Sequence, residues 1–265
     1  MQVSPFLPRI LEILIRKAEP DADLHETIAE TLGQISLHTV NNSQVSFGER
    51  VSLFEMILGG IKRLLADRSK VARSAGSLCL SKVIPKTHRS VLTAAAKESG
   101  RTLIGECIEA TLQCVSSSIQ VQPTTLKSIG VIIDCDEEEF AHSVQQFIPE
   151  LLRIINSQNQ DAASKKHCID VLNKIIDTYP DQIQASSKEI FKTLAPLKSA
   201  PSDMLQVRKV SLSTIKLLRQ KSPDCDSRNS HLARSSKGLT MSRKSPEIGT
   251  VRASRKSPNR VYYSG

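Results

Sequence analysis

The chain has 265 residues and a formal net charge of +9, with no tryptophan and only 3% aromatic residues. It contains no apolar run of about 18 residues, the length that a membrane-spanning helix needs, and its N-terminus lacks the basic and apolar segments of a secretory signal. The composition therefore predicts one or two domains whose core is packed with Leu, Ile, Val and Ala, as is common in stacked helices.

The six cysteines predict neither a disulfide nor a metal site. None forms a Cys-x-x-Cys pair, and most fall within helical patterns, where a thiol behaves as a small apolar residue. Cys107 and Cys114 share a helix face but lie two turns apart, roughly 10 Å, which is too far for a disulfide or for one metal ion. We expect reduced thiols, as in the cytosol or nucleus, and neither a metal nor a cofactor.

In chain order, apolar residues with helical spacing recur in pairs of segments. The stripe that begins at Phe54 and continues at Ile57, Leu58 and Ile61 is typical. No convincing run of alternating strand residues intervenes, so the sequence predicts an all-α fold. The predicted pairs are 5–17 with 23–38, 49–66 with 70–84, 101–117 with 123–134, 137–156 with 161–179, and 182–196 with 204–220.

The pairs recur about every 35–50 residues, which is the spacing of HEAT and armadillo repeats. A single pair cannot bury its apolar stripe alone, so residues 1–220 are predicted to stack into a HEAT/armadillo-like right-handed solenoid. The longer connections fall between pairs, and that at 85–100 is expected to hold a short helix near 91–96. A globular bundle is the alternative, because the loops vary in length. No polar capping helix precedes the first pair, which predicts a fragment or a chain that lacks earlier repeats.

Residues 221–265 differ in kind from the preceding chain and predict a disordered basic tail. They contain ten Lys or Arg against three Asp or Glu, a net charge of +7, and little apolar periodicity. The pentapeptide Ser-Arg-Lys-Ser-Pro occurs at 242–246 and again at 254–258. Such a tail favours binding to an acidic surface, with Arg243, Lys244, Arg255 and Lys256 as candidate contacts. The alternative is a solvated terminus without a partner.

Serine before proline among basic residues suits proline-directed kinases, which makes Ser222, Ser245 and Ser257 predicted phosphosites. Each phosphate adds about −1.5 to −2 charges. Three phosphates would lower the tail charge from +7 to roughly +1 to +2.5. The predicted consequence is an electrostatic switch on binding.

Motifs of catalysis are missing from the sequence. It has no Gly-rich phosphate loop and no Gly-x-Ser-x-Gly elbow, and its six histidines show no ligand spacing. The acidic run at 134–139 lacks the alternating ligands and turn glycine of a calcium loop, so we interpret it as the start of a helix whose positive end it complements. The sequence therefore predicts a protein without catalytic residues and without a small-molecule substrate.

Basic residues cluster near the turns within the helix pairs, most of them in the first turns of the second helices. In a solenoid these turns share one edge, so the cations are predicted to form a ridge that binds an acidic surface. The alternative is that they bond to neighbouring turns, for example Asp67 with Lys70 or Arg73 and Asp203 with Arg208. The candidate residues are Arg16, Lys17, Arg68, Lys70, Arg73, Lys127, Lys165, Lys166, Arg208 and Lys209.

Segment 64–84, LLADRSKVARSAGSLCLSKVI, resembles a repeat of the plant Tortifolia/Spiral-type microtubule-associated proteins. So do PRILEIL at 8–14 with AETLGQIS at 29–36, and the last pair, with VRKVS at 207–211 and IKLLR at 215–219. The resemblance extends over about residues 3–220 and is carried by repeat order and loop placement. Members of this family combine an N-terminal TOG-like HEAT array with a basic Ser/Pro-rich linker and a C-terminal domain.

The resemblance implies a non-enzymatic protein of the cytoplasm and cytoskeleton that binds tubulin or microtubules, regulates their dynamics and organisation, and has no membrane partner. Set against the family pattern, the resemblance implies a chain that lacks the earliest repeats and ends within the basic linker, and the sequence has no Trp for the TOG contact with tubulin. These departures favour binding to the microtubule lattice over binding to free tubulin.

Two other functions stay open on the sequence. An adaptor for another protein, for example in nuclear transport, would use the concave face of the solenoid, usually with a ladder of Asn or Trp. Nucleic-acid binding through the tail is the other alternative. The tail has the cations for it, but Tyr262 and Tyr263 are its only aromatic residues and offer little base stacking, so the microtubule function is preferred.

Overall fold

The structure, a computed structural model, describes residues 7–18, 24–135 and 137–225. The described residues all belong to one compact unit, Met1–Asp226. Over these ranges the fold is all-α and contains no strand, apart from an isolated bridge between Ala95 and Thr102. The predicted fold class is confirmed.

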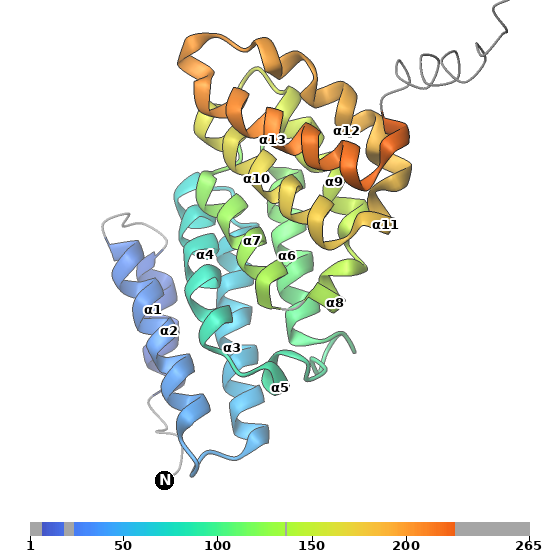
Figure 1. Cartoon of the computed structure of the whole chain (residues 1–265). Coiled ribbons are helices and arrows are strands. Elements are labelled where there is room, and N and C mark those ends of the chain that lie inside the picture. Colours follow the sequence, from blue (N-terminus) through green and yellow to red (C-terminus); the bar gives the residue numbers. More distant parts are fainter. Residues whose placement is uncertain (1–6, 19–23, 136, 226–265) are drawn as a thin grey trace, which may run out of the picture. The chain divides into compact units, whose positions relative to one another are not determined.

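Ten main helices form the described part of the chain, and shorter turns of helix join them (Figure 1). The main helices are α1 (Leu7–Ala18), α2 (His25–Asn41), α3 (Phe47–Ala66), α4 (Lys70–Val83), α6 (Leu103–Ser117), α7 (Pro123–Cys135), α9 (Val144–Asn156), α10 (Ala162–Thr178), α12 (Ser187–Leu194) and α13 (Leu205–Lys221). The short α-helices are α5 (Arg89–Leu92), α8 (Glu137–Ala141) and α11 (Pro180–Ile183). Five 3-10 turns complete the order: η2 (Ile84–Lys86), η3 (Gln184–Ser186), η4 (Pro196–Ser199), η5 (Ser202–Met204) and η6 (Pro223–Cys225).

The main helices form two layers. The first helices of the pairs pack in the order α1, α3, α6, α9 and α12, and the second helices in the order α2, α4, α7, α10 and α13, each on the next. Figure 1 shows this regular succession of neighbours. Because each pair contacts only the pairs beside it, the arrangement is a helical repeat stack and not the globular bundle that was the alternative.

Side-chain caps start several of these helices after short turns. Ser46 and Glu49 form a reciprocal capping box at α3, where the Glu49 carboxylate accepts from the Ser46 amide at 2.8 Å. Ser69, Thr102 and Asp161 cap α4, α6 and α10 by accepting a backbone N–H from the third residue of the helix. These polar residues fix where the turns lie.

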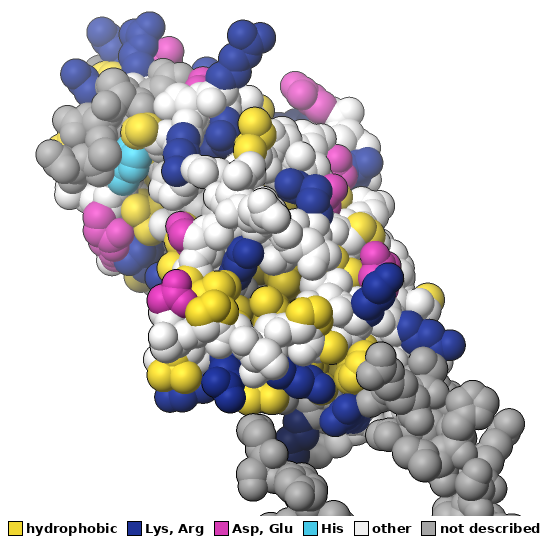
Figure 2. All heavy atoms as spheres, turned by 90° about the horizontal axis from the view of Figure 1, so that it is seen from above, with side chains coloured by type: hydrophobic (Ala, Val, Ile, Leu, Met, Phe, Trp, Pro, Cys, Tyr) yellow, Lys and Arg dark blue, Asp and Glu magenta, His cyan; other side chains and the backbone are white. Residues whose placement is uncertain are grey.

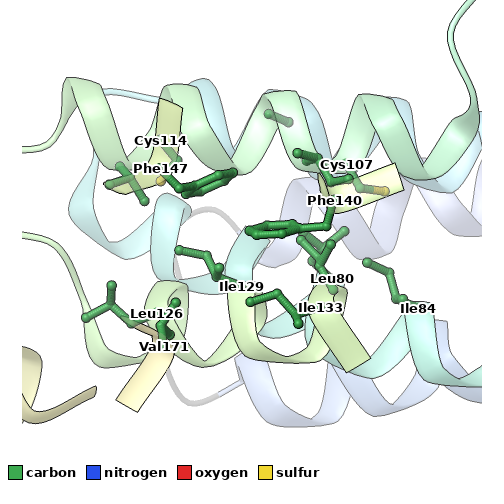
Figure 3. Packing of buried hydrophobic residues seen from close by; sticks show 14 of the residues in the cluster. Leu80, Ile84, Cys107, Cys114, Leu126, Ile129, Ile133, Phe140, Phe147 and Val171 are labelled. Carbon is green, nitrogen blue, oxygen red and sulfur yellow. The ribbon is translucent and has the colours of Figure 1, made fainter. Parts of the chain in front are cut away.

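The centre of the core lies where α8 and α9 meet α6 and α7. The rings of Phe140 and Phe147 stack with centroids 5.0 Å apart, and Figure 3 shows them between Cys107 of α6 and Ile129 of α7. These side chains are buried, and aromatic pairs of this kind add stability beyond their buried area. Aliphatic residues and thiols fill the remaining space, as the composition predicts.

Beyond small shifts of helix ends, three predicted elements differ from the structure. The predicted helix 137–156 is two helices, because the chain turns after Ala141 and the Ser143 amide bonds the carbonyl of Phe140 at 2.9 Å. The predicted helix 182–196 starts earlier, at Pro180, whose fixed φ suits a first helical position, and then tightens into η3 before α12. The short helix expected near 91–96 is α5, which ends at Leu92.

The predicted domain boundary at residue 220 falls too early. Lys221 is the last residue of α13, and η6 then brings Cys225 into the core with 3% of its surface exposed. The buried thiol of Cys225 holds η6 against the stack. It lies outside the apolar stripe of α13, so the helical spacing of apolar residues does not predict its burial. The folded unit therefore includes residues that were assigned to the tail.

Candidate partner-binding surface

The turns within the helix pairs lie at one end of the stack, because the first helix of each pair leads to this end and the second leaves it. Hydrogen bonds join neighbouring turns. Gln120 accepts from Lys70 Nζ at 3.3 Å and donates through Nε2 to the carbonyl of Asn159 at 3.2 Å. Gln160 donates to the carbonyl of Ile119 at 3.0 Å. We call the described turns 67–69, 118–122, 157–161 and 195–204 the turn end.

Three of the predicted cations have partners within the fold. Arg73 donates from its guanidinium to the backbone carbonyls of Asp67 at 2.7 Å and Arg68 at 2.8 Å, and so closes the turn before its own helix. Lys166 pairs with Asp170 at 2.7 Å, and Lys70 bonds Gln120. For Arg73 the structure thus supports the alternative role of bonding to a turn.

The ion pairs that the sequence suggested as the alternative, Asp67 with Lys70 or Arg73 and Asp203 with Arg208, are not formed among the described residues. The Asp67 carboxylate accepts the Ser69 amide at 2.6 Å instead of pairing with Lys70 or Arg73. Among the described residues, no ion pair joins Asp203 to Arg208, and both are exposed. Asp67 shapes the turn, and Arg208 is directed to solvent.

The remaining candidates leave their charges available at the surface. Lys165 is half-buried, and the others are exposed: Arg16, Lys17, Arg68, Lys127, Arg208 and Lys209. They lie in the last turn of α1, in a turn within a pair or in the first turns of α7, α10 and α13, near the turn end. Figure 2 looks down on this end and shows Lys and Arg side chains spread over it in separate groups instead of one continuous ridge.

An apolar residue that the sequence reasoning missed also lies at the turn end. Ile119, in the turn between α6 and α7, has 77% of its surface exposed. Ile119 stands between the polar residues Ser118 and Gln120 in a predicted turn, outside any apolar helical stripe. This position would have predicted an exposed apolar side chain. An exposed apolar side chain beside scattered cations provides a contact for a protein surface.

The predicted phosphosites separate into two groups. Ser222 is only 7% exposed, and its amide bonds the carbonyl of Leu218 at 2.7 Å. Because η6 packs this serine against the stack, a kinase would reach Ser222 only if η6 opened, and the predicted phosphosite there stays a prediction. Ser245 and Ser257 lie outside the described residues, as do the tail cations Arg243, Lys244, Arg255 and Lys256.

The titratable groups do not indicate a catalytic site. Burial raises the pKa of Cys79 to about 12 and also raises the pKa of Cys107 and Cys168, so these thiols stay protonated and unreactive at neutral pH. Hydrogen bonds from Lys86 and Gln34 lower the pKa of Glu30 to about 2. Over the described ranges, no group of three His, Cys, Asp or Glu residues is placed to hold a metal ion.

A cleft of about 250 Å³ lies between α3 and the connection before α6, and four of its charged side chains form two ion pairs. Lys62 pairs with Glu106 at 2.9 Å, and Lys97 pairs with Glu55 at 3.7 Å. Burial acts to raise the pKa of Glu106, but hydrogen bonds from Ser99 and Lys62 outweigh it and lower the value. These pairs connect repeats and leave Glu98, which is exposed, as the cleft's one charged lining residue without an ion pair to another described residue. No described helix is long and apolar enough to cross a membrane.

Comparisons with known proteins add the following findings. No family model and no curated protein matches the chain. A solved structure, a designed armadillo repeat protein, matches with 16% sequence identity and a TM-score of 0.33, over 80% of this chain and 99% of that chain. A likeness at this level carries no argument on function. The armadillo/HEAT-like repeat fold rests on the pairwise packing of the helices described above.

Proposed function

We propose that the chain is a microtubule-associated protein of the Tortifolia/Spiral type, located in the cytoplasm on the microtubule cytoskeleton. The turn end of its stack docks on tubulin, and its basic C-terminal segment adds affinity that depends on salt. In this role it regulates microtubule dynamics and organisation without catalysing a reaction. The sequence resemblance at 8–36, 64–84 and 207–219 is the starting point of the proposal.

The division of charge carries the proposal. Residues 227–265 contain nine Lys or Arg against one Glu, a net charge of +8, which leaves only +1 for the compact unit before them. A segment of this charge is attracted to any strongly acidic surface, and the microtubule is such a surface. A nearly neutral stack adds little long-range attraction, so its contribution is to select the partner through shape and local contacts.

The turn end supplies such local contacts. Arg208 and Lys209 are exposed in the first turn of α13, and Arg68 and Ile119 are exposed in two other turns of the same edge. Cations separated by small polar groups, with an exposed apolar residue among them, suit a protein surface that presents carboxylates at intervals. Charges at the rim of an interface chiefly affect the association rate and its salt dependence.

Microtubule co-sedimentation tests the role of the turn end. The variant Arg208→Glu/Lys209→Glu is expected to weaken binding roughly twofold to thirtyfold, since two exposed charges contribute about 0.2–1 kcal/mol each. The control Lys188→Glu/Lys216→Glu changes two exposed lysines that lie away from the turns within pairs, one at the start of α12 and one in the second half of α13, and it should bind as the native chain does. Equal binding by both variants would exclude this part of the turn end from the contact. Binding to DNA that tubulin does not displace would contradict the choice of partner.

A further inference from the structure

A groove of about 190 Å³ lies between α7 and α10, two neighbouring helices of the second layer. Its lining residues are Leu126, Lys127, Gly130, Val131, Asp134, His167, Asp170, Val171 and Lys174. Pockets for small molecules usually measure about 300–1,000 Å³. This groove is smaller, and its size suits one or two side chains of a bound segment.

Gly130, which has no side chain, faces Lys174 across this groove, and Lys174 Nζ donates to the Gly130 carbonyl at 3.3 Å. A Cβ atom at this position would have only the Lys174 side chain near it, with Nζ at 3.5 Å. Leu126 and Val171 are buried beneath, and Val131 is half-buried beside them. A helix interior normally disfavours glycine by about 1 kcal/mol relative to alanine, so the close approach of Lys174 to the backbone at Gly130 has a cost in helix stability.

Polar contacts bridge the neighbouring junctions of the second layer. Between α4 and α7, the hydroxyl of Ser77 bonds that of Thr125 at 2.7 Å, and Ser74 bonds Thr124 at 3.2 Å. Between α2 and α4, Lys82 pairs with Glu26 at 2.8 Å. Lys174 and Asp134 bridge the α7–α10 junction in the same way, and the groove lies beside this pair.

One positive charge at the groove is left uncompensated. Lys174 pairs with Asp134 at 2.6 Å, and Asp170 pairs with Lys166 at 2.7 Å. The exposed Lys127 forms no ion pair with another described residue. His167 lies 3.7 Å from Asp170, and burial, together with Lys127 and Lys166, lowers its pKa, so its imidazole is neutral at pH 7. The charged groups around the groove thus sum to one positive charge, on Lys127.

We propose that this groove binds an extended segment of a partner protein through an apolar side chain followed by an acidic one. The apolar side chain covers the floor formed by Leu126, Val131 and Val171, and the carboxylate pairs with Lys127. Charge complementarity selects the acidic residue, because each other charged side chain that lines the groove already has an opposite charge beside it. The inference goes beyond the microtubule proposal and needs neither the turn end nor the basic segment.

NMR on the isotopically labelled full-length chain tests the inference. The probe is acetyl-Ser-Leu-Glu-Ser-amide, and the matched control is the same peptide with Gln in place of Glu. At millimolar probe we expect saturable shifts at the Gly130 amide and the His167 ring, with binding of the control weaker by about twofold to fivefold, the contribution of one exposed ion pair. The neutral His167 should gain a higher pKa when the carboxylate binds, which a purely structural role would not produce.

Two variants separate the floor from the charge. Gly130→Leu fills the floor with a better helix former, so the fold is kept while the probe shifts disappear. Lys127→Ala should reduce binding of the Glu probe to that of the Gln control, whereas Lys188→Ala, which removes an exposed lysine of α12, should not change it.

Shifts that persist in Gly130→Leu, or that are absent from the groove in the native chain, would overturn the proposal. The same holds if deletion of 227–265 moves the groove resonances before any probe is added, since the chain would then occupy its own groove. Microtubule pelleting of Gly130→Leu should equal that of the native chain, so failure here and failure of the proposed function can be told apart.

Discussion

Arg73 and Arg208 both lie near the start of a second-layer helix, but their side chains have different surroundings. Arg73 holds two carbonyls of the turn before α4, whereas Arg208 is exposed on α13. Replacing Arg73 would leave two carbonyls without a charged donor, so it should lower the stability of the fold more than replacing the exposed Arg208. The two residues therefore separate a structural cation from one that is available to a partner.

Replacing Arg73 by Met should lower the free energy of unfolding by about 1–3 kcal/mol, because two charge-assisted hydrogen bonds disappear from a half-buried turn. Arg208→Met should stay within about 0.5 kcal/mol of the native chain, as surface changes usually do. Urea unfolding followed by circular dichroism measures both. Equal losses of stability would show that the turn does not depend on Arg73.

Glu30 gives a prediction for acid stability. Its pKa is about 2 in the folded chain against an ordinary value of 4.5, chiefly because Lys86 and Gln34 donate hydrogen bonds to it. A depressed carboxyl pKa contributes stability above pH 4.5, and this contribution is lost as pH falls toward 2. Glu30→Gln should flatten the fall of stability across this window. The control Glu98→Gln, at an exposed position, should retain the native profile, and an unchanged profile in Glu30→Gln would contradict the account.

At the scale of the element, the approach of α4 to α3 depends on Gly76. A Cβ atom at this position would lie 3.0 Å from Leu64 Cβ and 3.0 Å from the Leu65 backbone nitrogen, and neither atom can easily move aside. Gly59 on α3 has no atom within 4 Å of the same construction. The two glycines share a helical environment but differ in the space around them.

Gly76→Ala should lower the free energy of unfolding by about 1–3 kcal/mol, since overpacking outweighs the gain in helix propensity. Gly59→Ala should raise it by about 0.5–1 kcal/mol, because only the propensity changes. Thermal or urea unfolding of the pair provides the measurement. A stabilised Gly76→Ala chain would mean that the two helices separate readily.

Most helices were predictable because their apolar stripes have a regular period. The turn at 142–143 was not, because the buried residues Phe140, Val144 and Phe147 keep helical spacing across it. The end of the folded unit was also missed, since Cys225 anchors η6 without any stripe. The α7–α10 groove depends on how two distant segments face each other, which spacing along one helix does not reveal.

The candidate cations illustrate the same limit. Spacing placed them at the start of second-layer helices, and the stack brings these positions to one end. Spacing did not separate Arg73, which bonds carbonyls, from Arg208, which is free, because that difference depends on the conformation of the preceding turn. Ile119 was missed because a single apolar residue in a turn has no period.

At the scale of the whole molecule, the boundary at residue 226 makes the division of charge sharper. The segment 227–265 has a net charge of +8, and two Ser-Pro sites remain in it once Ser222 is assigned to the stack. Two phosphates would remove about 3–4 of these charges. Phosphorylation is thus proposed to reduce the attraction of the segment for an acidic surface without abolishing it.

Microtubule co-sedimentation of residues 1–226 and of the full chain, measured from low to high salt, tests the account most directly. The account predicts that both bind at low salt, that the full chain binds more tightly, and that this advantage shrinks as salt screens the nine cations of the segment. No sedimentation of the full chain at low salt would contradict the proposed function. Equal binding of the two chains at every salt concentration would contradict the role of the basic segment.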